Sequence, residues 1–134
     1  MSTLLKQYDD INVVYCENDN EAFGAIEAIE DAGYHVGSDI AAGDIMVMSF
    51  DGVNKEVLSY LLQDKISYVG ECNPNQGPKV QNLIQTLEAG KTPDKYSYME
   101  EHAFAHDATV PSVEVDGQMY SVTVMTKDKL KEYK

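Results

Sequence analysis

The sequence predicts an α/β fold, in which a three-layer parallel sheet with flanking helices is followed by a β-hairpin and a short helix. A short apolar run, a polar loop and an amphipathic stretch follow one another three times between residues 11 and 90. Strand and helix units joined by short links predict parallel strands with right-handed crossovers. Near the end of the chain, Asp116-Gly117 lies between alternating stretches, which is a strong hairpin signal.

The repeated units set the positions of the expected elements. Residues 2–8, with Leu4 and Leu5 facing inward, are predicted to be the end of an amphipathic helix. Apolar runs rich in β-branched and aromatic residues predict strands at residues 11–15, 45–50 and 66–72. Helical spacing of apolar residues predicts helices at residues 21–32, 54–63 and 78–89, the first ended by Gly33 and the last by Gly90.

The same pattern predicts which side chains are buried. The first strand reads as covered on both faces, and its Tyr15, together with Phe50 of the second strand, is expected to lie in the core. The third helix is expected to lie against the sheet through an apolar stripe, made of Val80, Leu83, Ile84 and Leu87.

After residue 93 the pattern changes, although the chain is expected to form one domain, residues 1–134. Weak alternation over residues 96–101 predicts an edge strand. The hairpin is expected over residues 113–120, strand continues through residues 121–125, and Thr126 is placed to cap a helix over residues 127–133. Residues 1–93 would therefore supply the strand and helix units, and residues 94–134 would close the fold.

Composition excludes several classes of protein. The net charge is −13, and the ten Lys and Arg residues are spread along the chain, which argues against a nucleic-acid partner. Residues 1–10 lack the basic start and apolar centre of a secretory signal, so the chain is expected to be cytosolic or to begin inside a longer one. Cys16 and Cys72 follow strands that a third strand would separate beyond disulfide reach, which predicts two buried thiols. The histidines and cysteines show no zinc-ligand spacing, so neither a metal nor a cofactor is expected.

Oxygen-bearing side chains follow each predicted strand: Glu17, Asn18 and Asp19, then Asp51, then Glu71 and Asn73. Ligands of open α/β sheets bind outside the carboxyl ends of the strands, and carboxylates with amides match the donors and acceptors of sugar hydroxyls. Strand geometry is expected to bring Asn18, Asp51 and Glu71 to one rim. The other polar residues nearby are expected to serve as caps and turn residues, namely Asp19, Asn20, Asn54 and Asn75.

Three stretches carry a resemblance to a known family: YCENDNEAFGAIEAIEDAGYHVG, MVMSFDGVNKEVLSYL and YVGECNPNQGPKVQNLIQTLEAGKTP. In this order they resemble the carboxy-terminal portion of sugar-binding proteins of bacterial ABC importers. These are the periplasmic-binding-protein type I superfamily, with its ribose, galactose and galactofuranose binders. The resemblance implies that sugar hydroxyls are bound by Asn18 with help from Asp19, by Asp51 and by Glu71. It makes Asn73 and Gln76 weaker candidates.

The resemblance also implies a biological role without catalysis. Two lobes would close around a monosaccharide outside the cytoplasm, and the closed form would be presented to the permease subunits of an ABC transporter. This chain would supply one incomplete lobe, a fragment whose N-terminal partner lobe is missing, and it is expected to bind free sugar weakly or not at all. Its first strand would be an exposed sheet edge through which a homodimer can form.

Two other functions fit part of the pattern. The resemblance extends to transcription repressors, in which the same kind of lobe is fused to a DNA-binding domain and senses a sugar. Alternatively, acidic strand ends could hold Mg²⁺ beside a phosphoaccepting Asp51, as in receiver-like domains. That second class places a lysine after a later strand, whereas the third strand here ends in ECNPNQ.

Overall fold

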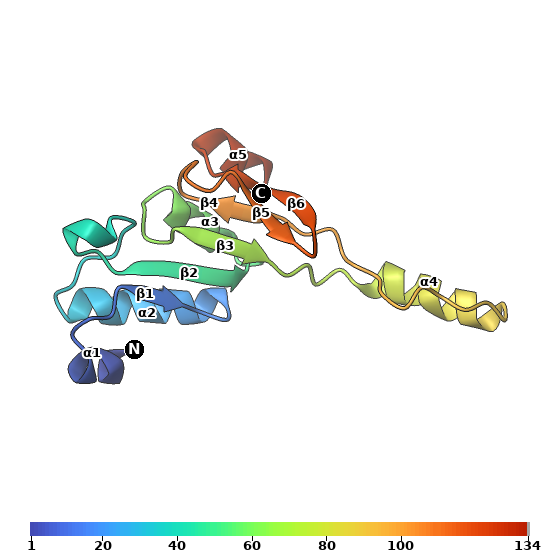
Figure 1. The fold of residues 1–134 in the computed structure, drawn as a ribbon, viewed down its shortest axis with the longest axis horizontal. Helices are drawn as coiled ribbons and strands as arrows, with labels where there is room; N and C mark the ends of the chain where they lie inside the picture. Colours follow the sequence, from blue (N-terminus) through green and yellow to red (C-terminus); the bar gives the residue numbers. More distant parts are fainter. Residues whose placement is uncertain (134) are drawn as a thin grey trace.

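The computed structural model describes residues 1–133, which form a mixed α/β fold around one curled sheet (Figure 1). The six strands are ordered β1-β2-β3-β4-β6-β5. β1, β2 and β3 are parallel, as predicted, whereas β4 runs antiparallel to β3 and parallel to β6, and β5 and β6 form the hairpin. The strands are β1 (Val13–Tyr15), β2 (Met46–Asp51), β3 (Tyr68–Glu71), β4 (Ala103–Ala105), β5 (Ser112–Val115) and β6 (Gln118–Val124).

Three of the α-helices begin at residues whose side chains cap them, whereas the first and the fourth α-helix have no side-chain cap among the described residues. Asn18 accepts from the backbone N–H of Glu21, Asn54 from that of Glu56, and Thr126 from that of Lys129. Each cap satisfies a backbone donor that the first turn leaves unpaired. The helical elements are α1 (Ser2–Gln7), α2 (Asp19–Asp31), the 3₁₀ turn η1 (Ile40–Ala42), α3 (Lys55–Leu61), α4 (Gly77–Glu88) and α5 (Lys127–Glu132). No helix among residues 1–133 is both long and apolar enough to cross a bilayer.

The hydrophobic core lies on one face of the sheet. Val47, Val69 and Phe104 alternate with residues of the other face and are at most 2% exposed. Ile29 of α2 and Leu61 of α3 complete this core and are fully buried. Alternation of side chains along each strand places these residues on a common face. The predicted α/β class with flanking helices is confirmed.

The opposite face of the sheet is more exposed than predicted. Tyr15, Met48 and Tyr68 lie side by side in register on this face, and Tyr15 is 60% exposed. Phe50 is 37% exposed, and its ring lies over Gly70 of β3. The prediction that Tyr15 and Phe50 lie in the core, and that the first strand is covered on both faces, is therefore wrong. An apolar run does not tell whether one face or both of a strand find a covering helix.

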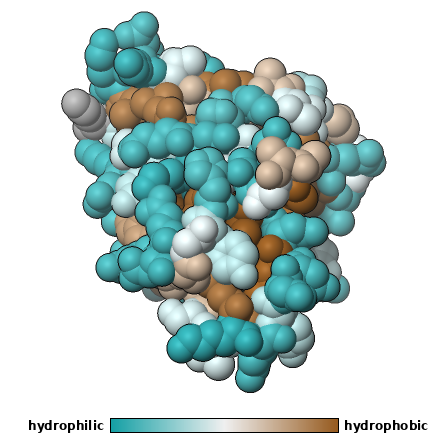
Figure 2. All heavy atoms as spheres, turned by 90° about the vertical axis from the view of Figure 1, so that its left-hand side faces the viewer, coloured by the Kyte–Doolittle hydropathy of each residue, from teal (hydrophilic) through white to brown (hydrophobic). Residues whose placement is uncertain are grey.

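Hydrophobic residues also reach the surface at the end of the molecule that carries α1 and η1. Figure 2 views this end and shows them between hydrophilic residues. Isolated apolar residues at a surface are ordinary, because polar atoms alone cannot cover a folded chain.

Helix α4 projects away from the sheet (Figure 1). None of its residues is buried, and Val80, Ile84 and Leu87 are about half exposed. The prediction that this stripe lies against the sheet is wrong. The reason is topological: β4 is antiparallel to β3, so the connection reverses direction and α4 is not a crossover helix.

The segment that returns from α4 also differs from the prediction. Residues 96–101 form no strand, and the strand that pairs with β3 is β4, a few residues later. The ammonium of Lys79 donates to the backbone oxygen of Tyr98, which holds the returning chain beside α4. At the far end of the chain the hairpin is as predicted, since Asp116 and Gly117 both have positive φ, the geometry of a type I′ turn.

Candidate functional site

A polar hollow of about 400 Å³ lies at the carboxyl ends of β1 and β2. Its volume is within the range of small-molecule sites. The residues around it come from two stretches of the chain, one that runs from the loop after β1 into the first turn of α2, and one that runs from the last residue of β2 into the loop before α3. They are Asn18, Asp19, Asn20, Asp51, Val53 and Asn54. The parallel pairing of β1 and β2 therefore brings Asn18 and Asp51 together, as predicted.

Asn18 offers the hollow a hydrogen-bond donor. Its Oδ1 accepts from the backbone N–H of Glu21 at 2.9 Å, because Asn18 caps α2. Within residues 1–133 its Nδ2 has no hydrogen-bond partner, so both N–H groups of the amide are available. The cap engages the oxygen of the side chain and fixes its orientation. The NH₂ group is the part that remains available to a ligand.

Asp51 offers the hollow acceptors. It is the last residue of β2 and has a φ of 108°, which is uncommon for a residue other than glycine. Its backbone oxygen accepts from the N–H of Cys72 at 2.8 Å, which joins it to the end of β3. In the described part of the chain its carboxylate has no hydrogen-bond partner, and it carries two oxygens that can accept from a ligand.

Asp19 is part of the wall of the hollow, and its carboxylate is used within the protein. The residue is 3% exposed. Its Oδ1 accepts from the hydroxyl of Ser49 at 2.8 Å and the N–H of Gly52 at 3.4 Å, and its Oδ2 accepts from the N–H of Asn54 at 3.1 Å. These donors, together with its place in the first turn of α2, offset the cost of a buried charge.

Glu71 and Asn73 lie at the end of β3 but do not line the hollow. Oε2 of Glu71 accepts from the N–H of His102 at 2.8 Å and lies 2.6 Å from Nδ1 of the same residue. Asn73 is bound to the two residues before His102, with its N–H donating to Oε1 of Glu101 and its amide to the oxygen of Glu100. Because β4 pairs with β3, residues 100–102 lie beside this strand end and use its polar groups.

Neither thiol forms a disulfide, as predicted, because β2 separates the strands that precede them. The prediction that both thiols are buried is wrong for Cys72, which is half-buried at the end of β3. Cys16 is buried at the end of β1. Burial raises the pKa of its thiol above the ordinary value, and the nearby charge of Glu21 acts in the same direction. Cys16 is therefore a protonated, apolar neighbour of the hollow at neutral pH.

Sequence reasoning missed four contributors to this site, one of which is Asn20, a lining residue that was expected only to cap a helix or form a turn. Ser49 supplies a buried hydroxyl, and its position as the one polar residue of the run IMVMSF is the signal that marks it. Val53 was not singled out, and Asn54 was expected only to cap α3, which it does. The roles of Val53 and Asn54 as lining residues depend on the shape of a loop, for which the sequence holds no signal.

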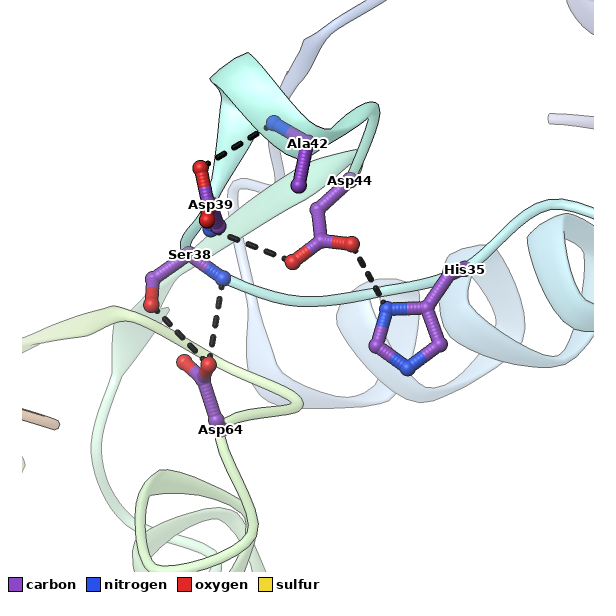
Figure 3. A network of polar contacts seen from close by, with 6 residues as sticks. All are labelled: His35, Ser38, Asp39, Ala42, Asp44 and Asp64. Atoms are coloured by element: carbon purple, nitrogen blue, oxygen red, sulfur yellow. Dashed lines mark hydrogen bonds and ion pairs between the residues drawn. The ribbon is translucent and has the colours of Figure 1, made fainter.

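A second polar network lies at the opposite, amino-terminal edge of the parallel strands (Figure 3). Asp64, with a φ of 54°, accepts from the N–H and the hydroxyl of Ser38 through Oδ2. Nearby, Asp44 accepts from the N–H of Asp39 and pairs with Nδ1 of His35 at 2.7 Å. These contacts join the loop before β2 to the turn before β3, so we interpret the network as structural.

Among residues 1–133, no group of three or more His, Cys, Asp or Glu side chains is placed to hold a metal ion. The arrangement at the hollow offers amide donors from Asn18 and carboxylate acceptors from Asp51. It can bind a small ligand that both donates and accepts hydrogen bonds, such as a compound with adjacent hydroxyl groups.

Comparison with known proteins bears on the nature of that ligand. No family model matches the chain. The Fructose import binding protein FruE of Bifidobacterium longum is 29% identical over 103 residues, which are 75% of this chain and 29% of that protein. The Ribose import binding protein RbsB of Bacillus subtilis is 39% identical over 67 residues, which are 50% of this chain and 19% of that protein.

A solved structure gives the same result for the fold. A protein from Mycobacterium smegmatis in complex with β-D-fucofuranose superimposes with a TM-score of 0.65 and 31% identity. The match covers 78% of this chain and 33% of that one. The resemblance to sugar-binding import proteins is confirmed. The chain spans about a third or less of the length of these three proteins and is similar to a part of them.

Proposed function

We propose that this chain supplies one side of a monosaccharide-binding site in a solute-binding protein of an ABC importer. The observation that carries the proposal is that Asn18, which has an amide donor, and Asp51, which has a carboxylate acceptor, line one hollow. A sugar hydroxyl donates one hydrogen bond and accepts others, so a hollow lined by a donor and a charged acceptor matches it. The relatives support the choice of sugar, because their names refer to fructose and ribose import.

Within this proposal the site residues have different roles. Asn18 and Asp51 contact the sugar directly. Glu71 and Asn73 are added to the site only if the contacts with His102, Glu101 and Glu100 are released, since these contacts occupy them here. Ligand-induced exchange of such contacts is one way in which closure can be coupled to binding.

The proposed partner is a second lobe of a longer protein, and α4 supports it. Val80, Ile84 and Leu87 form an apolar stripe on a helix that projects from the sheet beyond the end of β3. A second lobe that covers this stripe would also close over the neighbouring hollow. The closed protein would then be presented to permease subunits outside the cytoplasm, and no catalytic step is involved.

A homodimer through the edge of β1 is the remaining proposed contact. β1 is the outermost strand of the sheet, and its Val13 and Tyr15 are 42% and 60% exposed. An unprotected edge strand offers unpaired backbone groups to another chain. The net charge of −13 opposes such pairing at low salt, so we expect it only at high protein concentration and high ionic strength.

The proposed function is tested by titrating the ¹⁵N-labelled chain with D-ribose, D-fructose and L-arabinose at millimolar concentrations, followed by NMR. Binding is expected to be weak, because one side of a site gives only part of the contacts. The perturbed amides are expected to cluster at Asn18, Asp51, Val53 and Asn54. Tight binding measured by calorimetry would contradict the half-site, and perturbations scattered away from the hollow would contradict the site.

A further inference from the structure

We propose that Asp19 is a positioning residue, which holds Asp51 in its unusual backbone conformation so that the Asp51 carboxylate lines the hollow. This role rests on the proposed function, because it concerns the residue that would contact the sugar. It differs from the expectation that Asp19 helps to bind the sugar directly. The carboxylate of Asp19 is almost fully buried and is already bound by donors of the protein.

The contacts of Asp19 lie on both sides of Asp51 in the chain. Ser49, two residues before Asp51, donates its hydroxyl to Oδ1 of Asp19, and Gly52, directly after Asp51, donates its N–H to the same oxygen. Asn54 donates its N–H to Oδ2. One carboxylate therefore fixes the chain before and after the residue whose φ is 108°.

This arrangement also explains how an unfavourable conformation is maintained. A residue other than glycine at such a φ persists only where its surroundings determine it. On the other side of the strand end, the N–H of Cys72 donates to the backbone oxygen of Asp51, so the residue is held from β3 as well. Asp19 is the only charged group in this set, and bonds to a charged acceptor are the stronger ones.

Asp19 also ties Asp51 to Asn18. Asp19 is the first residue of α2 and follows directly after Asn18, the residue that caps the helix. The same side chain therefore links the loop that carries the amide donor to the loop that carries the carboxylate acceptor. We infer that it sets the spacing between the two groups, in the way that a supporting residue fixes a binding site before the ligand arrives.

The test compares Asp19→Asn, Ser49→Ala and the control Asp31→Asn in the full chain. Asp31 is the last residue of the same helix and is exposed, so Asp31→Asn makes the same chemical change away from the hollow. Asp19→Asn replaces one acceptor by a donor that faces backbone donors. Ser49→Ala removes the hydroxyl, which also lies 3.5 Å from the backbone oxygen of Phe50, and leaves the Asp19 carboxylate in place. It provides a milder variant if Asp19→Asn folds poorly.

The first readout is local and needs no sugar. Hydrogen exchange of the Gly52 and Asn54 amides is expected to become at least about tenfold faster in Asp19→Asn, with altered Asp51 Cα and carbonyl shifts, and to change less in Ser49→Ala. The amides of Val47 and Val69, in the core strands, report global opening. Acceleration confined to the loop supports the proposal, whereas equal acceleration everywhere, or none, overturns it.

The second readout is binding of D-ribose, D-fructose and L-arabinose by NMR titration. Asp19→Asn is expected to bind these sugars with a dissociation constant about tenfold higher than that of the unaltered chain. Asp31→Asn is expected to leave the dissociation constant unchanged. Unchanged binding despite shifted Asp51 resonances overturns the positioning role. If the unaltered chain binds none of these sugars but the loop exchange responds as expected, the proposed function fails for these sugars and the hold of Asp19 on Asp51 is supported.

Discussion

The carboxylate of Glu71 lies 2.6 Å from Nδ1 of His102 and accepts from the backbone N–H of the same residue. This contact joins the end of β3 to the segment just before β4, across 31 positions of the chain. The contact engages the carboxylate of Glu71, which would otherwise be available at the same edge of the sheet as Asp51. Glu71 and Asp51 are partners in the register of β3 and β2.

Replacement of His102 by alanine tests the weight of this contact. His102→Ala is expected to lower the free energy of unfolding by about 1 kcal/mol, because a half-buried carboxylate loses its side-chain partner. Urea unfolding measures the change. Lys131→Ala is the control: both Lys131 and its partner Asp128 are largely exposed, so their pair should contribute less. An equal loss in both variants would speak against a special role for the Glu71 contact.

Two glycine substitutions test the close packing of Phe50 on β3. A Cβ on Gly70 would lie 2.9 Å from the Phe50 ring, so Gly70→Ala is expected to destabilise the fold by about 1–3 kcal/mol. A Cβ on Gly24, in α2, would have nothing within 4 Å, and Gly24→Ala is expected to stabilise the fold by about 0.5–1 kcal/mol. Thermal unfolding should show a lower melting temperature for Gly70→Ala and a higher one for Gly24→Ala. The added variant Phe50→Ala should recover part of the loss in Gly70→Ala.

The exposure of α4 predicts that its apolar stripe contributes little to the stability of this chain. The triple replacement of Val80, Ile84 and Leu87 by serine is expected to change the free energy of unfolding by less than about 0.5 kcal/mol per site. Leu61→Ala, in the fully buried core, is expected to cost about 2–5 kcal/mol. Denaturant titration compares them, and a large loss from the triple variant would mean that α4 packs on the sheet in solution.

The raised pKa of Cys16 predicts a loss of stability in alkali. Below pH 9.0, the ordinary value, the thiol is protonated in both the folded and the unfolded chain. Above it the unfolded chain releases the proton while the buried thiol retains it, so unfolding becomes easier as the pH rises. Burial raises the pKa of Tyr68 as well, which extends the same trend above pH 10.0.

The contribution of Cys16 is isolated by comparing urea unfolding below and above pH 9.0 in the unaltered chain and in Cys16→Val. The variant lacks the titrating group, so its stability should fall less steeply with pH. Alkylation gives a second check, because the half-buried Cys72 should react before Cys16 in the folded protein. Identical pH profiles for the two chains would show that Cys16 does not titrate differently in the folded state.

Local signals predicted much of this fold. Caps at Asn54 and Thr126, the turn at Asp116-Gly117 and the apolar runs of β2 and β3 each act over a few residues, and the structure has them as expected. The placement of Asn18 and Asp51 at one hollow was also predictable, because parallel neighbouring strands bring their carboxyl ends to one edge.

The features that could not be predicted depend on contacts between distant residues. The stripe of α4 has ideal spacing for burial, but the antiparallel direction of β4 keeps the helix away from the sheet. Glu71 has the right position for the hollow, yet its carboxylate is bound by a histidine far along the chain. Tyr15 has a strand pattern, but nothing in that pattern reports whether a helix covers its face.

The hollow and the interior of the molecule are built from separate sets of residues. Val47, Val69 and Phe104 lie within the strands, while the residues that line the hollow lie at the end of β2, in the first turn of α2 and in the two loops that follow β1 and β2. The two sets meet at Ser49, which is buried within β2 and whose hydroxyl holds Asp19. As a consequence, substitutions in the two loops can change which ligand is accepted without repacking the interior, provided that Ser49 and Asp19 are retained.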